Sequence, residues 1–179
     1  MPEKRRRDDE ERSNTLMEPI TYKQITFTLN GKTVTTSVDV RLSLLEVLRD
    51  TFGMTSVKKG CEVGECGACT VIIDGETYDS CIYLAAWVDG KDVLTLEGLM
   101  DEDGNISDIQ QAFIDEAAVQ CGFCTPGFIM SSWKLLSTGK RYTRDEIRRE
   151  LSGNMCRCTG YQNIINAVEK VMNDRLAEK

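Results

Sequence analysis

The pattern of hydrophobic and polar positions predicts paired β-strands in the first half of the chain. Two pairs of short runs rich in β-branched residues are each separated by a turn dipeptide, Asn30-Gly31 in the first pair and Asp74-Gly75 in the second. Such dipeptides are strong signals for a tight hairpin, because both positions tolerate positive φ. The expected strands are 24–29, 32–38, 70–73 and 76–78, followed by short elements at 82–88 and 93–96.

The same pattern predicts helices, most of them in the second half. Three helix starts carry a capping box, in which a Ser or Thr and a Glu or Gln three residues later satisfy each other's backbone N–H groups. These pairs are Ser43 with Glu46, Ser107 with Gln110, and Thr143 with Glu146. The first of these helices is expected to end at Gly53. Another is expected at Thr125-Pro126, with Thr as the cap and Pro first in the helix. Apolar residues on one face predict a last helix over about 161–176.

These elements divide the chain into three predicted parts. Residues 1–19 form a charged block without periodicity, which is typical of a disordered tail. Residues 20–97, with two hairpins and one helix, predict an α+β domain. Residues 98–179 predict a domain of four helices, and the polar run 101–105 at its start is the expected linker.

Composition restricts the possible partners and location of the protein. Its 179 residues, 41% hydrophobic and 28% charged, are typical of a packed globular protein. A formal net charge of −7 argues against nucleic acid or an anionic membrane as a partner. The sequence has neither a run of about 18 apolar residues, the length that spans a bilayer, nor an apolar secretory signal at its start. We therefore expect a soluble, cytoplasmic protein that does not enter a membrane.

Two residue counts narrow the chemistry. The chain has no histidine, which excludes His-based acid–base catalysis, His-ligated zinc and Rieske-type ligation. It has eight cysteines, which fall into two groups of four along the sequence. Because the cytosol keeps thiols reduced, eight cysteines there indicate metal binding rather than a disulfide framework.

The first group has the spacing of a plant-type ferredoxin. Cys61, Cys66 and Cys69 lie in one glycine-rich loop, and Cys81 follows the second predicted hairpin. This C-x4-C-x2-C…C arrangement lets three thiolates converge on a small inorganic core from one curled loop, while a fourth closes the site. Glycines let the backbone approach closely and direct N–H groups at the sulfurs. A structural zinc site is the alternative, but zinc ribbons usually pair two C-x2-C motifs.

The second group is ambiguous when it is taken alone. Cys121 and Cys124 form a C-x2-C motif, and Cys156 and Cys158 form a C-x-C motif. A zinc knuckle is an alternative, whereas a thioredoxin-like redox pair requires a preceding strand, and the surroundings here are predicted to be helical. Both motifs are expected just before helix N-termini, where unpaired N–H groups favour anionic thiolates. Four such thiolates could hold one 2Fe–2S core.

Three motifs together carry a specific resemblance. Residues 59–71 (KGCEVGECGACTV), 120–127 (QCGFCTPG) and 153–161 (GNMCRCTGY) occur in this order. They resemble the iron–sulfur subunit of the molybdenum hydroxylases, the family of xanthine dehydrogenase and aldehyde oxidoreductase. The resemblance extends over about residues 22–172. It implies an α+β fold, with an N-terminal β-grasp, plant-type ferredoxin domain followed by a four-helix-bundle 2Fe–2S domain.

The resemblance also implies cofactors, partners and site residues. It assigns two 2Fe–2S clusters, one held by Cys61, Cys66, Cys69 and Cys81, the other by Cys121, Cys124, Cys156 and Cys158. The second cluster would lie nearest the molybdopterin cofactor of a large subunit, and Gln120 and Cys158 match positions that approach the pterin. The first cluster would pass electrons to FAD on a further subunit.

The implied function is electron relay within an oxidoreductase complex, from a molybdopterin centre to FAD and an acceptor such as NAD. The chain itself is assigned no catalytic residue. The run 81–87 (CIYLAAW) resembles bacterial xanthine dehydrogenase small subunits, so a purine substrate is expected for the complex. A related nicotinate, N-heterocycle, aldehyde or carbon monoxide dehydrogenase is the alternative, and so is a free-standing ferredoxin-like carrier.

Overall fold

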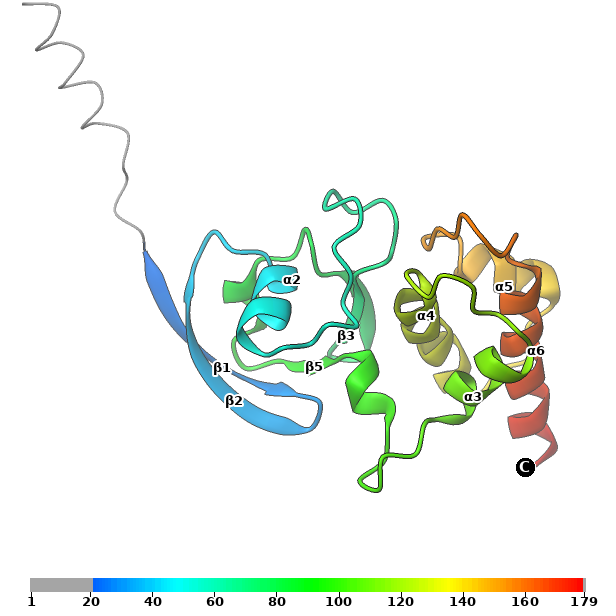
Figure 1. The fold of residues 1–179 in the computed structure, drawn as a ribbon. Helices are drawn as coiled ribbons and strands as arrows, with labels where there is room; N and C mark the ends of the chain where they lie inside the picture. The colour runs from blue at the N-terminus through cyan, green and yellow to red at the C-terminus, as the bar shows by residue number, and fades with distance from the viewer. Residues whose placement is uncertain (1–20, 179) are drawn as a thin grey trace, which may run out of the picture.

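The computed structural model describes residues 21–178, and the chain folds into a sheet-containing part followed by a helical part (Figure 1). Each part has its own hydrophobic core. The α+β class and the order of the two parts are as predicted. The predicted tail, residues 1–19, lies outside the described residues.

The first part is built on one five-stranded sheet in the order β2-β1-β5-β3-β4. Its strands are β1 Tyr22–Leu29, β2 Lys32–Asp39, β3 Thr70–Ile73, β4 Glu76–Asp79 and β5 Asp92–Leu94. Among the strand pairs of residues 21–178, only β1 and β5 run parallel. Asn30 and Gly31 both have positive φ, and so do Asp74 and Gly75. Both predicted hairpins are therefore confirmed, including the left-handed backbone that their turn dipeptides favour.

A short helical segment packs on this sheet and differs from the prediction in its helix type. The Ser43–Glu46 capping box is present and opens α2, Leu44–Glu46. The segment continues to Thr51 as a π-helical turn, Val47–Thr51, and Gly53, with a φ of +69°, follows the C-cap Phe52 as expected. There the Phe52 N–H bonds the carbonyl five residues earlier, at 3.3 Å. The Phe52 ring meets Phe27 of β1 edge-on, with ring centroids 5.6 Å apart, which holds the end of this turn on the sheet.

The second part contains the four predicted helices. They are α3 Asp108–Asp115, α4 Thr125–Ser137, α5 Arg144–Glu150 and α6 Gln162–Ala177. The capping boxes of α3 and α5 are present as predicted. Thr125 is not the cap of α4, however. The cap is Cys124, because its carbonyl already accepts the bond from the Phe128 N–H, at 3.2 Å.

The two parts meet where α4 packs against β3 and β4 (Figure 1). The Lys134 ammonium of α4 bonds the Glu76 carboxylate of β4 at 2.7 Å and the Gly75 carbonyl at 2.6 Å. The loops that carry the cysteines lie at the upper edge of the molecule in Figure 1, on both sides of this junction. None of the helices in the described part of the chain has the length and apolarity that a bilayer crossing requires.

The α5 capping box offers a direct test of local stability. Thr143 Oγ1 accepts from the Glu146 N–H at 3.3 Å, and the Glu146 carboxylate accepts from the Thr143 N–H at 2.7 Å. Thr143→Ala should lower the free energy of unfolding by about 1 kcal/mol, because it leaves an N–H of the first turn unpaired. Thr143→Ser keeps the hydroxyl and should change it by less than about 0.5 kcal/mol. Denaturant unfolding followed by circular dichroism measures both, and equal stability of the Ala and Ser variants would contradict the assignment.

Candidate metal centres

The first group of cysteines is assembled by one loop and the end of one hairpin. Cys61, Cys66 and Cys69 lie in the loop that leads into β3, and Cys81 follows β4. The Cys69 carbonyl accepts from the Ser80 N–H at 3.4 Å and from the Ser80 hydroxyl at 2.8 Å. These bonds bring Cys81 beside Cys69, where the two thiols interact. The structure thus places Cys61 next to Cys66 and Cys69 next to Cys81, within the loop and hairpin that the sequence grouped.

Backbone N–H groups point at the sulfurs of this loop. The Val63 and Glu65 N–H groups approach Cys61 Sγ at 3.5 and 3.3 Å, and the Cys61 N–H approaches Cys66 Sγ at 3.4 Å. The bonds from Val63 and Glu65 lower the pKa of Cys61 to about 7. Gly60 permits this close wrapping, since a Cβ at that position would lie 2.7 Å from Cys66 Sγ. The loop therefore stabilises negative charge on its sulfurs.

Cys69 differs from Cys61 because it lies in the core of the sheet part. Its side chain is 2% exposed, and burial raises the pKa of its thiol to about 12. Its Sγ lies 3.8 Å from the Asp79 carboxylate, and burial raises the pKa of that carboxyl too. A metal ligand must be a thiolate, so iron would have to displace a tightly held proton here.

The second group is assembled by two loops of the helical part. Cys121 and Cys124 end the α3–α4 connection, and Cys156 and Cys158 lie between α5 and α6. Cys121 Sγ and Cys158 Sγ are 3.6 Å apart, and the thiols of Cys124 and Cys156 interact with each other. In this group all four predicted cysteines are brought together. Burial raises the pKa of Cys124 to about 12, whereas the Phe123 N–H lowers the pKa of Cys121.

Both motifs precede helix N-termini, as predicted. Cys124 is the N-cap of α4, and Cys156 and Cys158 lie just ahead of α6, which begins at Gln162. The donors at Cys156 Sγ, however, come from a neighbour that the sequence reasoning missed and not from α6. Thr159 directs its N–H and its hydroxyl at Cys156 Sγ, at 3.4 and 3.0 Å. Burial acts to raise the pKa of Cys156, yet these bonds outweigh it and lower that pKa.

The donor set of both groups fits 2Fe–2S clusters. All eight cysteines are free thiols, and each group combines four sulfurs with N–H donors. In residues 21–178, no three Cys, Asp or Glu side chains are arranged to hold a single metal ion. That finding is compatible with a binuclear cluster, whose four thiolates are shared between two irons.

The remaining predicted site residues lie at the exposed edge of the second group. Gln120 is exposed and directly precedes Cys121, and Cys158 is exposed beside it. The two groups are also in contact through the backbone, because the Met155 N–H bonds the Cys66 carbonyl at 2.9 Å. Met155 directly precedes Cys156, so the two cysteine-bearing loops touch.

Comparisons with known proteins agree with this arrangement. The "2Fe-2S iron-sulfur cluster binding domain" model matches residues 27–96, and the "[2Fe-2S] binding domain" model matches residues 95–169. The xanthine dehydrogenase iron-sulfur-binding subunit of Escherichia coli O157:H7 is 52% identical, over 79% of this chain and 89% of that subunit. The nicotine 6-hydroxylase small subunit of Paenarthrobacter nicotinovorans is 47% identical, over 81% of this chain and 87% of that small subunit.

Solved structures give the same result. Quinoline 2-oxidoreductase from Pseudomonas putida 86 superposes with a TM-score of 0.82 at 39% identity, covering 88% of this chain and 94% of that chain. The aldehyde oxidoreductase of Desulfovibrio gigas superposes equally well, with a TM-score of 0.82 at 38% identity, but only 18% of that longer chain is covered.

Fold and site together define a protein with two 2Fe–2S binding domains, a ferredoxin-like one and a helical one. The chain belongs to the family of iron–sulfur subunits of the molybdenum hydroxylases. Its function is electron transfer as the iron–sulfur subunit of an oxidoreductase. The predicted family, fold class and cofactors are confirmed.

Proposed function

We propose that the eight cysteines are the cluster ligands. Cys61, Cys66, Cys69 and Cys81 hold one 2Fe–2S cluster, and Cys121, Cys124, Cys156 and Cys158 hold the other. The observation that carries this proposal is the clustering of the cysteines. In the second quartet Cys121 Sγ and Cys158 Sγ are 3.6 Å apart, and in the first quartet the thiols interact in two pairs, Cys61 with Cys66 and Cys69 with Cys81. Bound clusters supply one-electron redox chemistry. The chain itself holds the sulfurs in place, neutralises part of their charge through N–H groups and keeps water away from Cys69 and Cys156.

We propose domain boundaries close to those expected from the sequence. Residues 20–97 form the ferredoxin-like domain, residues 98–179 form the helical domain, and residues 1–19 form a charged tail. Two observations support the boundary near residue 97. The two hydrophobic cores are formed by residues on opposite sides of it, and the two family models meet at residues 95–96.

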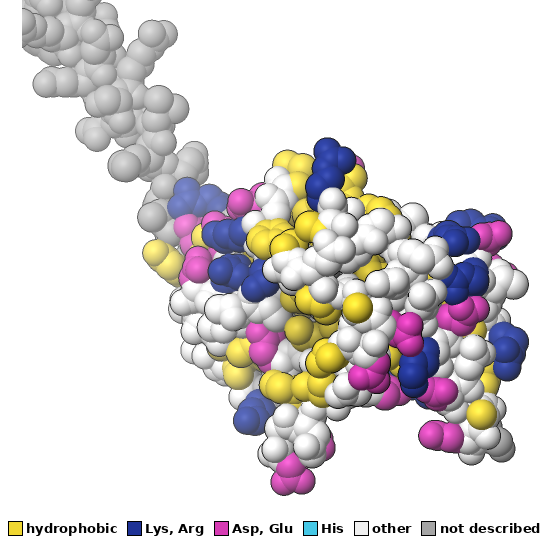
Figure 2. All heavy atoms as spheres, turned by 45° about the vertical axis from the view of Figure 1, so that its right-hand side comes forward, with side chains coloured by type: hydrophobic (Ala, Val, Ile, Leu, Met, Phe, Trp, Pro, Cys, Tyr) yellow, Lys and Arg dark blue, Asp and Glu magenta, His cyan; other side chains and the backbone are white. Residues whose placement is uncertain are grey.

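We propose that the second cluster faces the molybdopterin subunit and that Gln120 and Cys158 contact the pterin. Their exposure supports this orientation, and so do large apolar side chains on the cysteine loops. Phe123 is 46% exposed and Met155 is 58% exposed, although burial is the favoured state of such side chains. Figure 2 shows hydrophobic side chains gathered in the middle of one face, with charged groups around them. An apolar centre with a polar rim is typical of a protein interface.

We further propose that the ferredoxin-like domain delivers electrons to an FAD-binding subunit, and that the complex works in the cytoplasm. Val63, in the first cysteine loop, is 64% exposed and offers an apolar contact for that partner. Eight free thiols agree with assembly in a reducing compartment. The net charge of −7 argues against nucleic acid as a partner.

A purine is the substrate class that we propose for the complex. The similarity to a xanthine dehydrogenase subunit, at 52% identity, supports this choice. The second candidate is another N-heterocycle or an aldehyde, because other relatives are named for nicotine, nicotinate, caffeine and aldehyde. We place the substrate contacts on the large subunit, so the choice between these candidates rests on that subunit.

The experiment is purification of the tagged chain, under anaerobic conditions, from the cells that produce it. We expect about four iron and about four acid-labile sulfide per chain, together with stably bound subunits that contain molybdenum and FAD. Xanthine and hypoxanthine should be oxidised faster than nicotinate or aldehydes. About two zinc and no sulfide would overturn the cluster proposal. Isolation of the chain alone, with both clusters, would support the free-standing carrier instead.

A further inference from the structure

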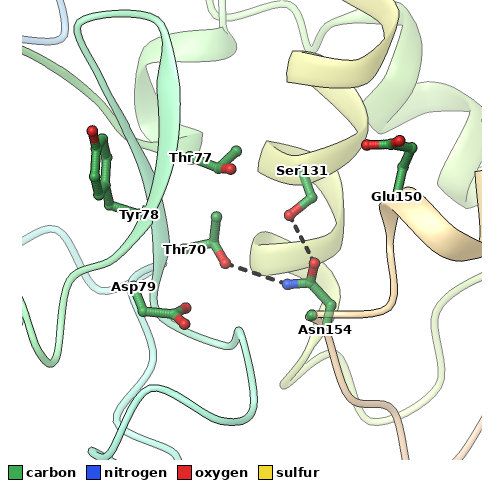
Figure 3. A pocket seen from close by; sticks show the side chains of 8 residues that line it. Thr70, Thr77, Tyr78, Asp79, Ser131, Glu150 and Asn154 are labelled. Atoms are coloured by element: carbon green, nitrogen blue, oxygen red, sulfur yellow. Dashed lines mark hydrogen bonds between the residues drawn. The ribbon is translucent and has the colours of Figure 1, made fainter.

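We infer that Asn154 is a positioning residue that sets the distance and orientation between the two clusters. This inference rests on the ligand assignment proposed above. Asn154 was not singled out by sequence reasoning, and it holds no metal. Its side chain is 6% exposed and lies at the junction of the two parts, between β3 and α4 (Figure 3).

The Asn154 amide bonds both domains at once. Its Nδ2 donates to the Gly67 carbonyl at 2.9 Å and to Thr70 Oγ1 at 3.3 Å, both in the ferredoxin-like domain. Its Oδ1 accepts from the Ser131 hydroxyl of α4 at 2.7 Å, as Figure 3 shows. An amide can donate at one end and accept at the other, which a carboxylate of the same shape cannot do. The chemistry of this junction therefore requires asparagine.

The partners of Asn154 belong to the cluster-binding loops themselves. Gly67 lies between Cys66 and Cys69, and Asn154 lies two residues before Cys156. The neighbouring Met155 N–H bonds the Cys66 carbonyl, so two successive residues hold the same strip of the first loop. One side chain and one peptide group thus fix the position of Cys66 relative to Cys156.

The space around Asn154 is closed on the side of the first loop. A Cβ on Gly67 would lie 2.4 Å from Asn154 Nδ2, and Gly67 has a φ of +65°. The backbone therefore comes directly against the amide, with no side chain between them. A buried amide that spans an interface and is satisfied at both ends specifies one docked geometry, because every alternative leaves a polar group unpaired.

This geometry is important for electron transfer, since electronic coupling between two centres falls steeply with their separation. Loss of the Asn154 bonds should let the two domains shift while each cluster stays in its own loop. The measurable consequence is a weaker magnetic interaction between the two reduced clusters. That interaction depends on distance and orientation, and a general loss of stability does not change it.

The test uses Asn154→Asp in the complete complex, because this change keeps the shape and removes the donor. Asn163→Asp is the matched control, since Asn163 Nδ2 also donates to a backbone carbonyl, that of Ala117 at 3.2 Å, but within the helical domain. Electron paramagnetic resonance of the fully reduced complex reports each cluster's own signal, together with the splitting and relaxation caused by its neighbour. We expect a weaker mutual interaction in N154D, with both individual signals retained, and no change in N163D.

Ser131→Ala keeps the test decisive if N154D loses a cluster. This variant removes only the donor to Oδ1 and leaves the Gly67 contact, so a partial weakening of the interaction is expected. Unchanged interaction in N154D with both clusters present would overturn the inference. If N154D has lost a cluster, an unchanged magnetic interaction in S131A would overturn the inference instead. Failure of the ligand proposal is distinguishable, because the unmodified complex would then lack iron and sulfide.

Discussion

Replacing Cys61 with alanine should lower the iron content from about four to about two per chain and stop electron flow through the complex. Cys61 Sγ receives two backbone N–H groups, from Val63 and Glu65, which makes it the most strongly stabilised thiolate of the first loop. Loss of a ligand should cost more activity than the roughly 10- to 100-fold that loss of an outer partner costs. Iron and sulfide analysis, together with turnover of the reducing substrate, measures both effects.

The chain offers a reciprocal control in Cys121→Ala. Cys121 belongs to the other quartet, where its Sγ lies 3.6 Å from that of Cys158. Both variants should retain about two iron, but they should lose different paramagnetic signals. Retention of about four iron in either variant would contradict the ligand assignment. Loss of all iron in both would mean that one cluster cannot assemble without the other.

Local features of the fold were predictable because their causes are local. The Asn30-Gly31 turn requires positive φ at two adjacent residues, and short-range chemistry alone identifies it. The α5 capping box is similar, since Thr143 and Glu146 are three residues apart. The cysteine quartets were predictable for another reason. Their spacing reflects the size of the group that we propose they hold, so it carries information about partners up to 37 residues apart, as for Cys121 and Cys158.

The errors in the prediction come from competition between neighbouring signals. Thr125 looked like a helix cap, but the chain is already helical at Cys124, whose carbonyl accepts the first bond. Cys156 and Cys158 lie ahead of α6 as expected, but the donors at Cys156 Sγ are the N–H and hydroxyl of Thr159 and not groups of that helix. In each case the cysteine loop, rather than helix propensity, decides the local conformation.

The junction between the domains was not predictable, because its contacts join residues far apart in sequence. Asn154 bonds the Gly67 carbonyl across 87 positions, and nothing in the local pattern distinguishes this amide from an exposed one. The clue was the position of Asn154 beside a ligand motif, which sequence reasoning read only for its cysteines. Close packing of two backbones is equally hard to predict. Its only mark in the sequence is a glycine at a position where the backbone does not require positive φ.

Gly127→Ala should therefore lower the free energy of unfolding by about 3 kcal/mol, because it forces overpacking at this junction. Gly127 lies in the first turn of α4, and a Cβ there would lie 2.0 Å from the Gly67 carbonyl oxygen. Both sides of this contact are backbone, so no rotamer change can relieve it. Helix propensity alone predicts that Gly127→Ala raises the free energy of unfolding, since alanine is favoured over glycine in a helix by about 1 kcal/mol.

Gly153→Ala is the matched control for this change. Gly153 lies next to Asn154 in the same junction, but a Cβ there would meet nothing within 4 Å. Its free energy of unfolding should change by less than about 0.5 kcal/mol. Denaturant unfolding of the two variants, each checked first for iron content, shows whether overpacking or helix propensity decides the stability of Gly127→Ala. If Gly127→Ala were as stable as Gly153→Ala, the two domains would not be held in close backbone contact, and the role of Asn154 in fixing the cluster geometry would lose its structural basis.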